Sequence, residues 1–195
     1  MSNENGLNRR RFLAAASAAV GAAGLGAAAI PFVRAMQPAQ DIIAAGVIEV
    51  DLSDVRGGEM RTFLWRQQPV LILRRTPEMI ERARRIDPGT LKDPATPEER
   101  VQRPEWLVCL GVCTHLGCVP SLQPDRLPGF DQPGLLCPCH GGQYDTLGRR
   151  LAGPPPENLY LLPHEFLSDT QLRVGAPSFA GTSAAVKKLT DLPKP

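Results

Sequence analysis

Two short motifs of cysteine and histidine place the strongest constraint on how this chain can fold. The first, at residues 113–118, reads CTHLGC, and the second, at residues 137–141, reads CPCHG. Four of the 5 cysteines and two of the 3 histidines lie in these motifs, a concentration that ordinary core or surface usage rarely produces. Because thiolates and imidazoles are the usual protein ligands of several metals, the sequence predicts a fold that brings both motifs to one metal centre.

The motifs allow more than one kind of centre. Two thiolates and two imidazoles would complete a tetrahedral zinc site. Such a site would leave Cys118 and Cys139 without a role as metal ligands. These two cysteines hold related places, one in each motif, and can bridge the motifs as a disulfide in an oxidising compartment. Clamped loops with mixed sulfur and nitrogen ligands also suit a [2Fe-2S] cluster of the Rieske type. A zinc-stabilised binding module and an electron carrier therefore both stay open at this point.

The composition is that of a globular protein with many turns. Of 195 residues, 43% are hydrophobic and 22% are charged, which suits one domain of ordinary size with an attached segment. The 20 prolines, the 18 glycines and an aromatic share of 5% favour turns and short strands over helix bundles. A net charge of +2 gives no sign of a nucleic-acid partner.

The N-terminal segment carries an export and anchoring pattern. Arginines at residues 9–11 precede an uncharged, alanine-rich run over residues 12–33, close to the twin-arginine pattern of exported proteins. The run is long enough to cross a bilayer. Three arginines before it and only Arg34 after it place the N-terminus in the cytoplasm by the positive-inside rule. Because Val33-Arg34-Ala35 is a poor cleavage site, we expect an uncleaved anchor over residues 12–34 rather than a removed signal peptide.

The remaining boundaries follow from changes in composition. We expect a cytoplasmic N-terminus over residues 1–11, a tether over 35–46, a periplasmic domain over 47–175 and a C-terminal tail over 176–195. The tether is too polar to continue the anchor and too apolar to be a free linker. The role of the tail cannot be read from its composition.

Strand patterns dominate the domain. Short alternating or apolar runs predict β-strands over residues 47–52, 60–65, 69–74, 106–112, 159–162 and 171–174. Thr76 is suited to cap a helix that starts at Pro77 and stops before Asp87-Pro88-Gly89, and a charged loop follows to Pro104. The patterns predict a mainly β domain with an antiparallel core and a helix-loop insertion.

The two motifs resemble those of the Rieske iron-sulfur proteins of the cytochrome bc1 complex. The twin-arginine anchor, the tether, the insertion over residues 76–105 and the Gly153-Pro154-Pro155-Pro156 segment also resemble that family, so the resemblance covers most of residues 9–175. It implies a Rieske-type antiparallel β sandwich with a small cluster-binding subdomain at about 109–158. It also implies one [2Fe-2S] cluster.

The resemblance implies a role for each residue of the site. Cys113 and Cys137 would bind the inner iron, His115 and His140 the outer iron, and Cys118 and Cys139 would form a disulfide. Leu116 would cover the cluster, Pro154 would belong to a loop over it, and Tyr144 would donate a hydrogen bond to the sulfur of Cys113. Cys109 and His164 lie outside both motifs, and we expect them to be structural.

The resemblance further implies a function in quinol oxidation. A subunit of this kind takes an electron from quinol, coupled to a proton, through His115 and His140, and passes the electron to cytochrome c1 as the domain swings on its tether. It would work with cytochromes b and c1 in a dimeric complex of the bacterial cytoplasmic membrane. The alternative is the small Rieske subunit of another periplasmic oxidoreductase, such as an arsenite oxidase. The insertion and the uncleaved anchor argue against this alternative.

One position departs from the family pattern. Many members carry, directly after the glycine of the second motif, a serine whose hydroxyl donates a hydrogen bond to a cluster sulfur, whereas this chain has Gly142. Because donors to sulfur raise the reduction potential, we expect a lower potential than in members with the serine. The midpoint potential itself and the quinone species cannot be read from the sequence.

Overall fold

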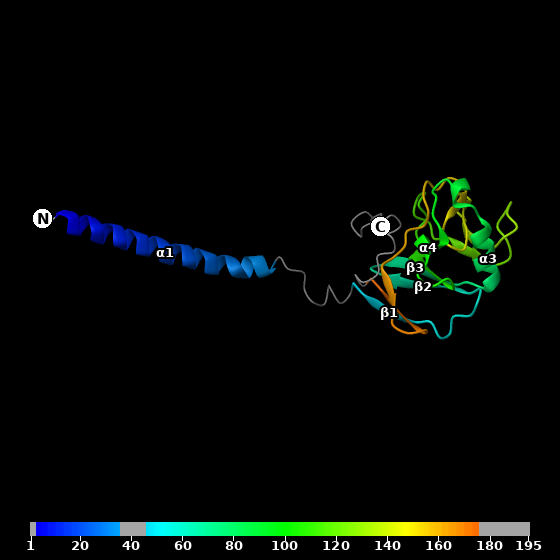
Figure 1. Cartoon of the computed structure of the whole chain (residues 1–195), viewed down its shortest axis with the longest axis horizontal. Helices are drawn as coiled ribbons and strands as arrows, with labels where there is room; N and C mark the ends of the chain where they lie inside the picture. The colour runs from blue at the N-terminus through cyan, green and yellow to red at the C-terminus, as the bar shows by residue number, and fades with distance from the viewer. Residues whose placement is uncertain (1–2, 36–45, 176–195) are drawn as a thin grey trace. The chain divides into compact units, whose positions relative to one another are not determined.

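The computed structural model describes residues 3–35 and 46–175, which fall into two units divided between Ala44 and Ala45. The first unit is one helix, α1 (Asn3–Ala35), shown in blue in Figure 1. Its segment Asn8–Ala35 is long and apolar enough to cross a membrane, as expected for an anchor. Most of the predicted tether and all of the predicted tail lie outside the described residues.

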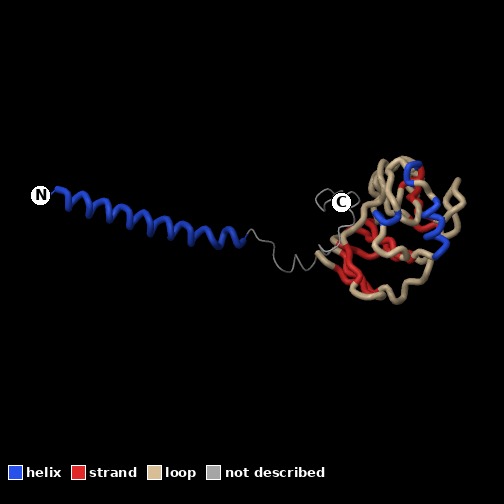
Figure 2. Tube along the Cα trace, viewed as in Figure 1, coloured by secondary structure: helices blue, strands red, loops and turns tan. Residues whose placement is uncertain are grey.

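Three antiparallel sheets build the second unit (Figure 2). The first sheet has the order β1-β10-β9, with β1 (Ile48–Asp51), β10 (Gln171–Val174) and β9 (His164–Phe166). The second has the order β2-β3-β4, with β2 (Met60–Trp65), β3 (Gln68–Arg74) and β4 (Trp106–Leu110). The third has the order β5-β6-β7-β8, with β5 (Ser121–Gln123), β6 (Gly134–Cys137), β7 (Gly142–Tyr144) and β8 (Arg150–Ala152).

The second sheet contributes to two hydrophobic cores. Along β3, Val70 and Ile72 join one core, whereas Leu71 and Leu73 join the other, as the alternation of side chains along a strand requires. The first core also contains residues of β1 and β10, including Val50, Leu172 and Val174. The second core contains Leu135, Cys113, Cys137 and Tyr144, so the same sheet supports the region of the two motifs.

The insertion is more helical than the sequence suggests. Helix α3 (Pro77–Arg85) has Thr76 as its N-cap and ends before Asp87, as predicted. A 3-10 turn at Pro88–Thr90 follows. The loop expected up to Pro104 contains a further short helix, α4 (Pro97–Arg100), which opens with a capping box of Thr96 and Glu99. That signature, Thr96 followed three residues later by Glu99, is visible in the sequence.

The strand predicted over residues 159–162 is wrong. Leu161 forms only an isolated bridge with Cys109, and β9 starts later, at His164. Leu159 and Leu161 lie in the second core and Leu162 in the first. The apolar run therefore reflects a segment buried between two cores, because burial on both sides gives the same pattern as a buried strand.

Candidate metal centre

The fold places each motif at the end of a strand. The first motif follows β4 directly, and the second forms the turn between β6 and β7, where Cys137 pairs with Gly142. The 18 residues between Cys118 and Cys137 contain β5, which pairs with β6. Because each motif is joined to a strand, the strand fixes the position of the first ligand residue in the motif.

Both motifs turn in the same way. The amide of Gly117 donates to the carbonyl of Cys113 at 2.9 Å, and the amide of Gly141 donates to the carbonyl of Cys137 at 3.0 Å. The two glycines have φ angles of +87° and +69°, a backbone conformation that is strained for any residue with a side chain. The glycine of each motif is therefore required by the turn that follows the first cysteine.

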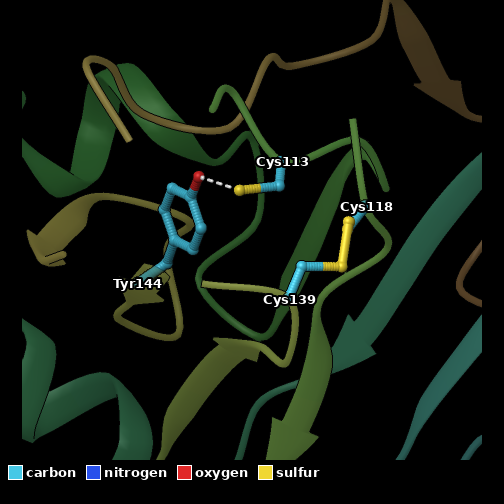
Figure 3. Close-up of a disulfide and its surroundings, with 4 residues drawn as sticks. All are labelled: Cys113, Cys118, Cys139 and Tyr144. Carbon is cyan, nitrogen blue, oxygen red and sulfur yellow. Dashed lines mark hydrogen bonds between the residues drawn. A yellow bond between two sulfur atoms is a disulfide. The ribbon is translucent and has the colours of Figure 1, made fainter. Parts of the chain in front are cut away.

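A disulfide joins the two turns. It links Cys118 with Cys139, the pairing that the family resemblance implies (Figure 3). Cys113 and Cys137 remain free thiols, with exposures of only 3% and 2%. The sulfurs of Cys118, Cys137 and Cys139 lie within 4.8 Å of one another, but the two in the disulfide cannot act as thiolate ligands. A metal can therefore draw on Cys113 and Cys137.

The two motif histidines lie together on the outer side of the site. The ring centroids of His115 and His140 are 4.7 Å apart, with the rings edge to face. His140 is exposed and His115 is half-buried, while Leu116 is 71% exposed. The site thus has two buried sulfur donors and two imidazoles that reach the surface.

Tyr144 connects the first motif to the third sheet. Its hydroxyl lies 3.2 Å from the sulfur of Cys113, as drawn in Figure 3, and accepts from the Thr114 amide at 3.3 Å. The Thr114 hydroxyl, 3.2 Å from the same oxygen, donates to the carbonyl of Glu157 at 2.7 Å. The Thr114 hydroxyl therefore does not donate to Tyr144, and the Tyr144 proton has two acceptors at 3.2 Å, the Cys113 sulfur and the Thr114 oxygen. Burial raises the pKa of Tyr144, so the phenol keeps that proton.

The Gly153 to Pro156 loop packs on the second motif. A Cβ on Gly153, whose φ is +89°, would lie 2.7 Å from the carbonyl oxygen of Gly141, so only glycine allows this close approach. Pro155 is buried and contacts Gly142, whereas Pro154, the residue that the resemblance implies for this loop, is exposed. The family resemblance did not single out Pro155.

Two buried arginines support the loop after β7. The guanidinium of Arg149, fully buried, donates to the Asp145 carboxylate at 2.7 Å and to the Ala83 carbonyl of α3 at 2.6 Å. Arg100 of α4 donates to the Leu159 carbonyl at 2.6 Å. Sequence reasoning missed both arginines, because a charged residue in a loop ordinarily faces solvent. It also missed Thr114, whose partners Tyr144 and Glu157 are far away in the sequence.

Cys109 and His164 are buried outside the two motifs, Cys109 in the same core as the sulfur donors. Burial raises the pKa of Cys109 to about 12, so its thiol stays protonated. The Nδ1 atom of His164 lies 2.8 Å from the Leu162 carbonyl oxygen, and burial lowers the pKa of its ring. Both residues are core residues, as predicted.

The donor set fits a [2Fe-2S] cluster with mixed ligands. The site offers two sulfurs and two nitrogens, the ligand set of a Rieske centre. Burial raises the pKa of Cys137, and a bound metal is what stabilises a thiolate in such surroundings. The hydroxyl of Tyr144, aimed at the Cys113 sulfur, suits a ligand that accepts hydrogen bonds.

Comparisons with known proteins agree on one family. The family model of the Rieske [2Fe-2S] domain matches residues 47–164, and the model described as the ubiquitinol-cytochrome C reductase Fe-S subunit TAT signal matches residues 1–39. The ubiquinol-cytochrome c reductase iron-sulfur subunit of Rhodospirillum rubrum is 46% identical, over 86% of this chain and 92% of the relative. The subunit of the same name from Bradyrhizobium diazoefficiens is 44% identical, over 86% and 94%.

A solved structure agrees with this assignment. A chain of a hyperthermophilic respiratory Complex III is similar with a TM-score of 0.54 and 26% identity, covering 83% of this chain and 99% of that chain. The matches span both the N-terminal helix and the β domain with its two motifs. This chain therefore belongs to the Rieske [2Fe-2S] family, among the iron-sulfur subunits of ubiquinol-cytochrome c reductase.

Proposed function

We propose that this chain is the electron-carrying Rieske subunit of a quinol-cytochrome c oxidoreductase. One observation supports this function most directly: the sulfur donors are buried while the two imidazoles meet at the surface. Because the cysteine side of the centre is buried and the histidine side is exposed, a substrate of an electron carrier of this kind can approach only at the histidines. The names of the relatives favour this function over an arsenite oxidase subunit.

Membership of the Rieske family and the burial of the two sulfur donors support one assignment of the ligands. Cys113 and Cys137 would bind the inner iron, and His115 and His140 would bind the outer iron. The cluster supplies a one-electron acceptor whose potential is raised because neutral imidazoles replace two thiolates. The Cys118–Cys139 disulfide holds the two ligand loops against each other, and Tyr144 donates to the sulfur of Cys113.

The histidines carry the exchange with substrate. Once it has lost its proton, the ring nitrogen that is not bound to iron can accept a hydrogen bond from a quinol hydroxyl and receive its proton as the electron leaves. Leu116, exposed next to His115, provides an apolar surface for the quinol ring. Cytochrome c1 would then take the electron at the same exposed side.

The cellular setting belongs to the same proposal. Helix α1 would anchor the chain in the bacterial cytoplasmic membrane with the β domain in the periplasm, and residues 35–46 would be the hinge. Cytochromes b and c1 would be its partners, in a dimeric complex. Export of a prefolded domain, which a twin-arginine signal provides, agrees with a cofactor inserted before translocation.

Electron paramagnetic resonance of ascorbate-reduced membranes tests this function. We expect a Rieske signal that changes when a quinol-site inhibitor is added, and loss of the signal in Cys113→Ala. Cys109→Ala is the matched control, because this thiol is also buried and free but lies outside the motifs, and its signal should persist. A colourless, silent protein that contains zinc would overturn the proposal. Failure to co-purify with cytochromes b and c1 would point to another oxidoreductase.

A further inference from the structure

The ring of Pro155 packs so closely on Gly142 that it takes the space of a side chain at position 142, beside Cys137. Gly142 is buried at the start of β7 and pairs with Cys137 across the hairpin. A Cβ built on Gly142 would lie 2.6 Å from Cγ and 3.0 Å from Cδ of Pro155. These distances are shorter than real carbon contacts, which begin near about 3.5 Å. The proline ring therefore fills the place that a side chain at position 142 would take.

The backbone does not explain the glycine. The φ of Gly142 lies outside the positive range that marks its neighbour Gly141 at +69°, so an L-residue could adopt this conformation. Nor can the obstacle move easily, since Pro155 is a buried ring with a fixed φ. Gly153, two residues earlier, already packs its backbone against Gly141 and Gly142. The exclusion at position 142 is thus steric and comes from the loop.

The excluded side chain would have pointed toward the ligand. The same built Cβ lies 3.5 Å from the Cβ of Cys137, so a hydroxyl one bond further could reach the sulfur of that residue in one of its staggered rotamers. Hydrogen bonds to the sulfurs help to set the potential of an iron-sulfur centre. On the Cys113 side such a donor is present, the Tyr144 hydroxyl at 3.2 Å. On the Cys137 side an apolar ring stands at the corresponding place.

We infer that Gly142 and Pro155 form a coupled pair that keeps the Cys137 side of the centre free of a side-chain donor at position 142, and so holds its reduction potential down. This inference rests on the proposed function, since it assumes a cluster at Cys137. Both members act as positioning residues. The coupling means that a donor cannot be restored at position 142 alone, because Pro155 blocks it.

A double-mutant cycle tests the coupling in membranes that contain the full complex. The variants are Gly142→Ser, Pro155→Ala and the two combined. The readouts are the midpoint potential, from a redox titration followed by electron paramagnetic resonance, and the amount of signal per polypeptide. Gly142→Ser alone should lose signal, because its Cβ meets the proline ring. The combined variant should recover the signal and show a midpoint above that of wild type and of Pro155→Ala.

A control separates the hydroxyl from the space. Gly142→Ala combined with Pro155→Ala has the same Cβ without a donor, so it should keep the signal while its midpoint stays below that of the serine double variant. Equal midpoints in the two double variants would overturn the donor argument. Full signal and a raised midpoint in Gly142→Ser alone would overturn the steric coupling. Absence of any Rieske signal in wild type would instead reject the proposed function, so the two failures are distinguishable.

Discussion

The base and the cluster lobe of the β domain are held together by different forces. We call the sheets β1-β10-β9 and β2-β3-β4 the base, and β5 to β8 with the two motifs the cluster lobe. In the base, β2 pairs with β3 over six residue pairs, and the two sheets enclose a core of large apolar side chains. The lobe has strands of three or four residues, as short as β1, β9 and β10 of the base, and its motifs pack on the second core. In the lobe, however, a disulfide and a buried ion pair also hold the loops.

This difference determines how the two regions respond to substitution. In an apolar core the stability is distributed over many side chains. Replacement of one apolar side chain by another of similar volume is tolerated well. The lobe consists largely of loops and depends on a few directed bonds. A substitution that deletes a single donor or acceptor atom can break one of these bonds. We therefore expect large single-residue effects at the buried polar groups of the lobe, where one substitution removes a directed bond.

Arg149→Met should give the largest loss of stability. It leaves the Asp145 carboxylate buried without its guanidinium partner, which costs about 3–5 kcal/mol. It also removes the bonds from Arg149 to the Ala83 and Ala95 carbonyls, which tie the insertion to the lobe. Chemical denaturation of the purified full-length protein, followed by circular dichroism, measures the change.

Arg85→Met is the matched control for this pair. Arg85 and Glu81 are also four residues apart and ion-paired, at 3.3 Å, but their side chains are 72% and 55% exposed. An exposed helical pair contributes only about 0.3–0.5 kcal/mol. Comparable losses in the two variants would contradict the view that burial makes the lobe sensitive.

Removal of the disulfide should come next. Cys118→Ser combined with Cys139→Ser opens a ring with a sequence separation of 21, which lowers stability by about 3 kcal/mol. We expect the cluster signal to fall sharply while far-ultraviolet circular dichroism keeps the β signal of the base. Joint loss of both signals would show that base and lobe unfold as one unit. Wild-type protein treated with a thiol reductant should behave like the double variant.

Base and lobe also differ in how far the sequence predicts them. Alternation along β2 and the buried run of β3 reflect regular burial, and all strands of the base except β9 were predicted within a few residues. The cap at Thr76 was also correct, because capping is local chemistry. The strand predicted over residues 159–162 was wrong, because a segment between two cores is apolar without forming a sheet.

The candidate site was predicted at its centre and missed at its supports. Cys113, His115, Cys137 and His140 stood out because their residue types are rare and their spacing is regular. Thr114 and Arg149 did not, because their roles depend on partners 30 to 66 positions away. The contact of Pro155 with Gly142 is of the same kind. Only the fold brings such residues together.

Tyr144→Phe should have a smaller effect, on potential more than on stability. Loss of one hydroxyl removes the bond to the Cys113 sulfur and costs about 1 kcal/mol of stability. Because donors to sulfur raise the potential, the midpoint should fall while the signal per polypeptide is kept. Tyr160→Phe is the control, since that hydroxyl donates to the Glu157 carboxylate at 2.8 Å. A midpoint that falls equally in both variants would contradict the role of Tyr144.

His164 of the base should give the smallest effect at pH 7.5, and one that grows as the pH falls. Burial lowers the pKa of this ring, so the unfolded chain takes up a proton before the folded one does. Stability is then fully present above the unfolded pKa of about 6.5 and is lost as pH falls through the folded pKa. While the unfolded chain carries one extra proton, the slope is at most about 1.4 kcal/mol per pH unit.

His164→Asn isolates this contribution. The asparagine amide can still donate to the Leu162 carbonyl, which the His164 Nδ1 atom meets at 2.8 Å, but it does not titrate. Denaturation midpoints measured from pH 7.5 to about 5 should therefore fall less steeply in the variant than in wild type. The reduced-cluster signal should be the same in both at pH 7.5, because the ring lies in the base. Parallel slopes would mean that acid destabilises the chain through groups other than His164, and would contradict its role in the pH dependence.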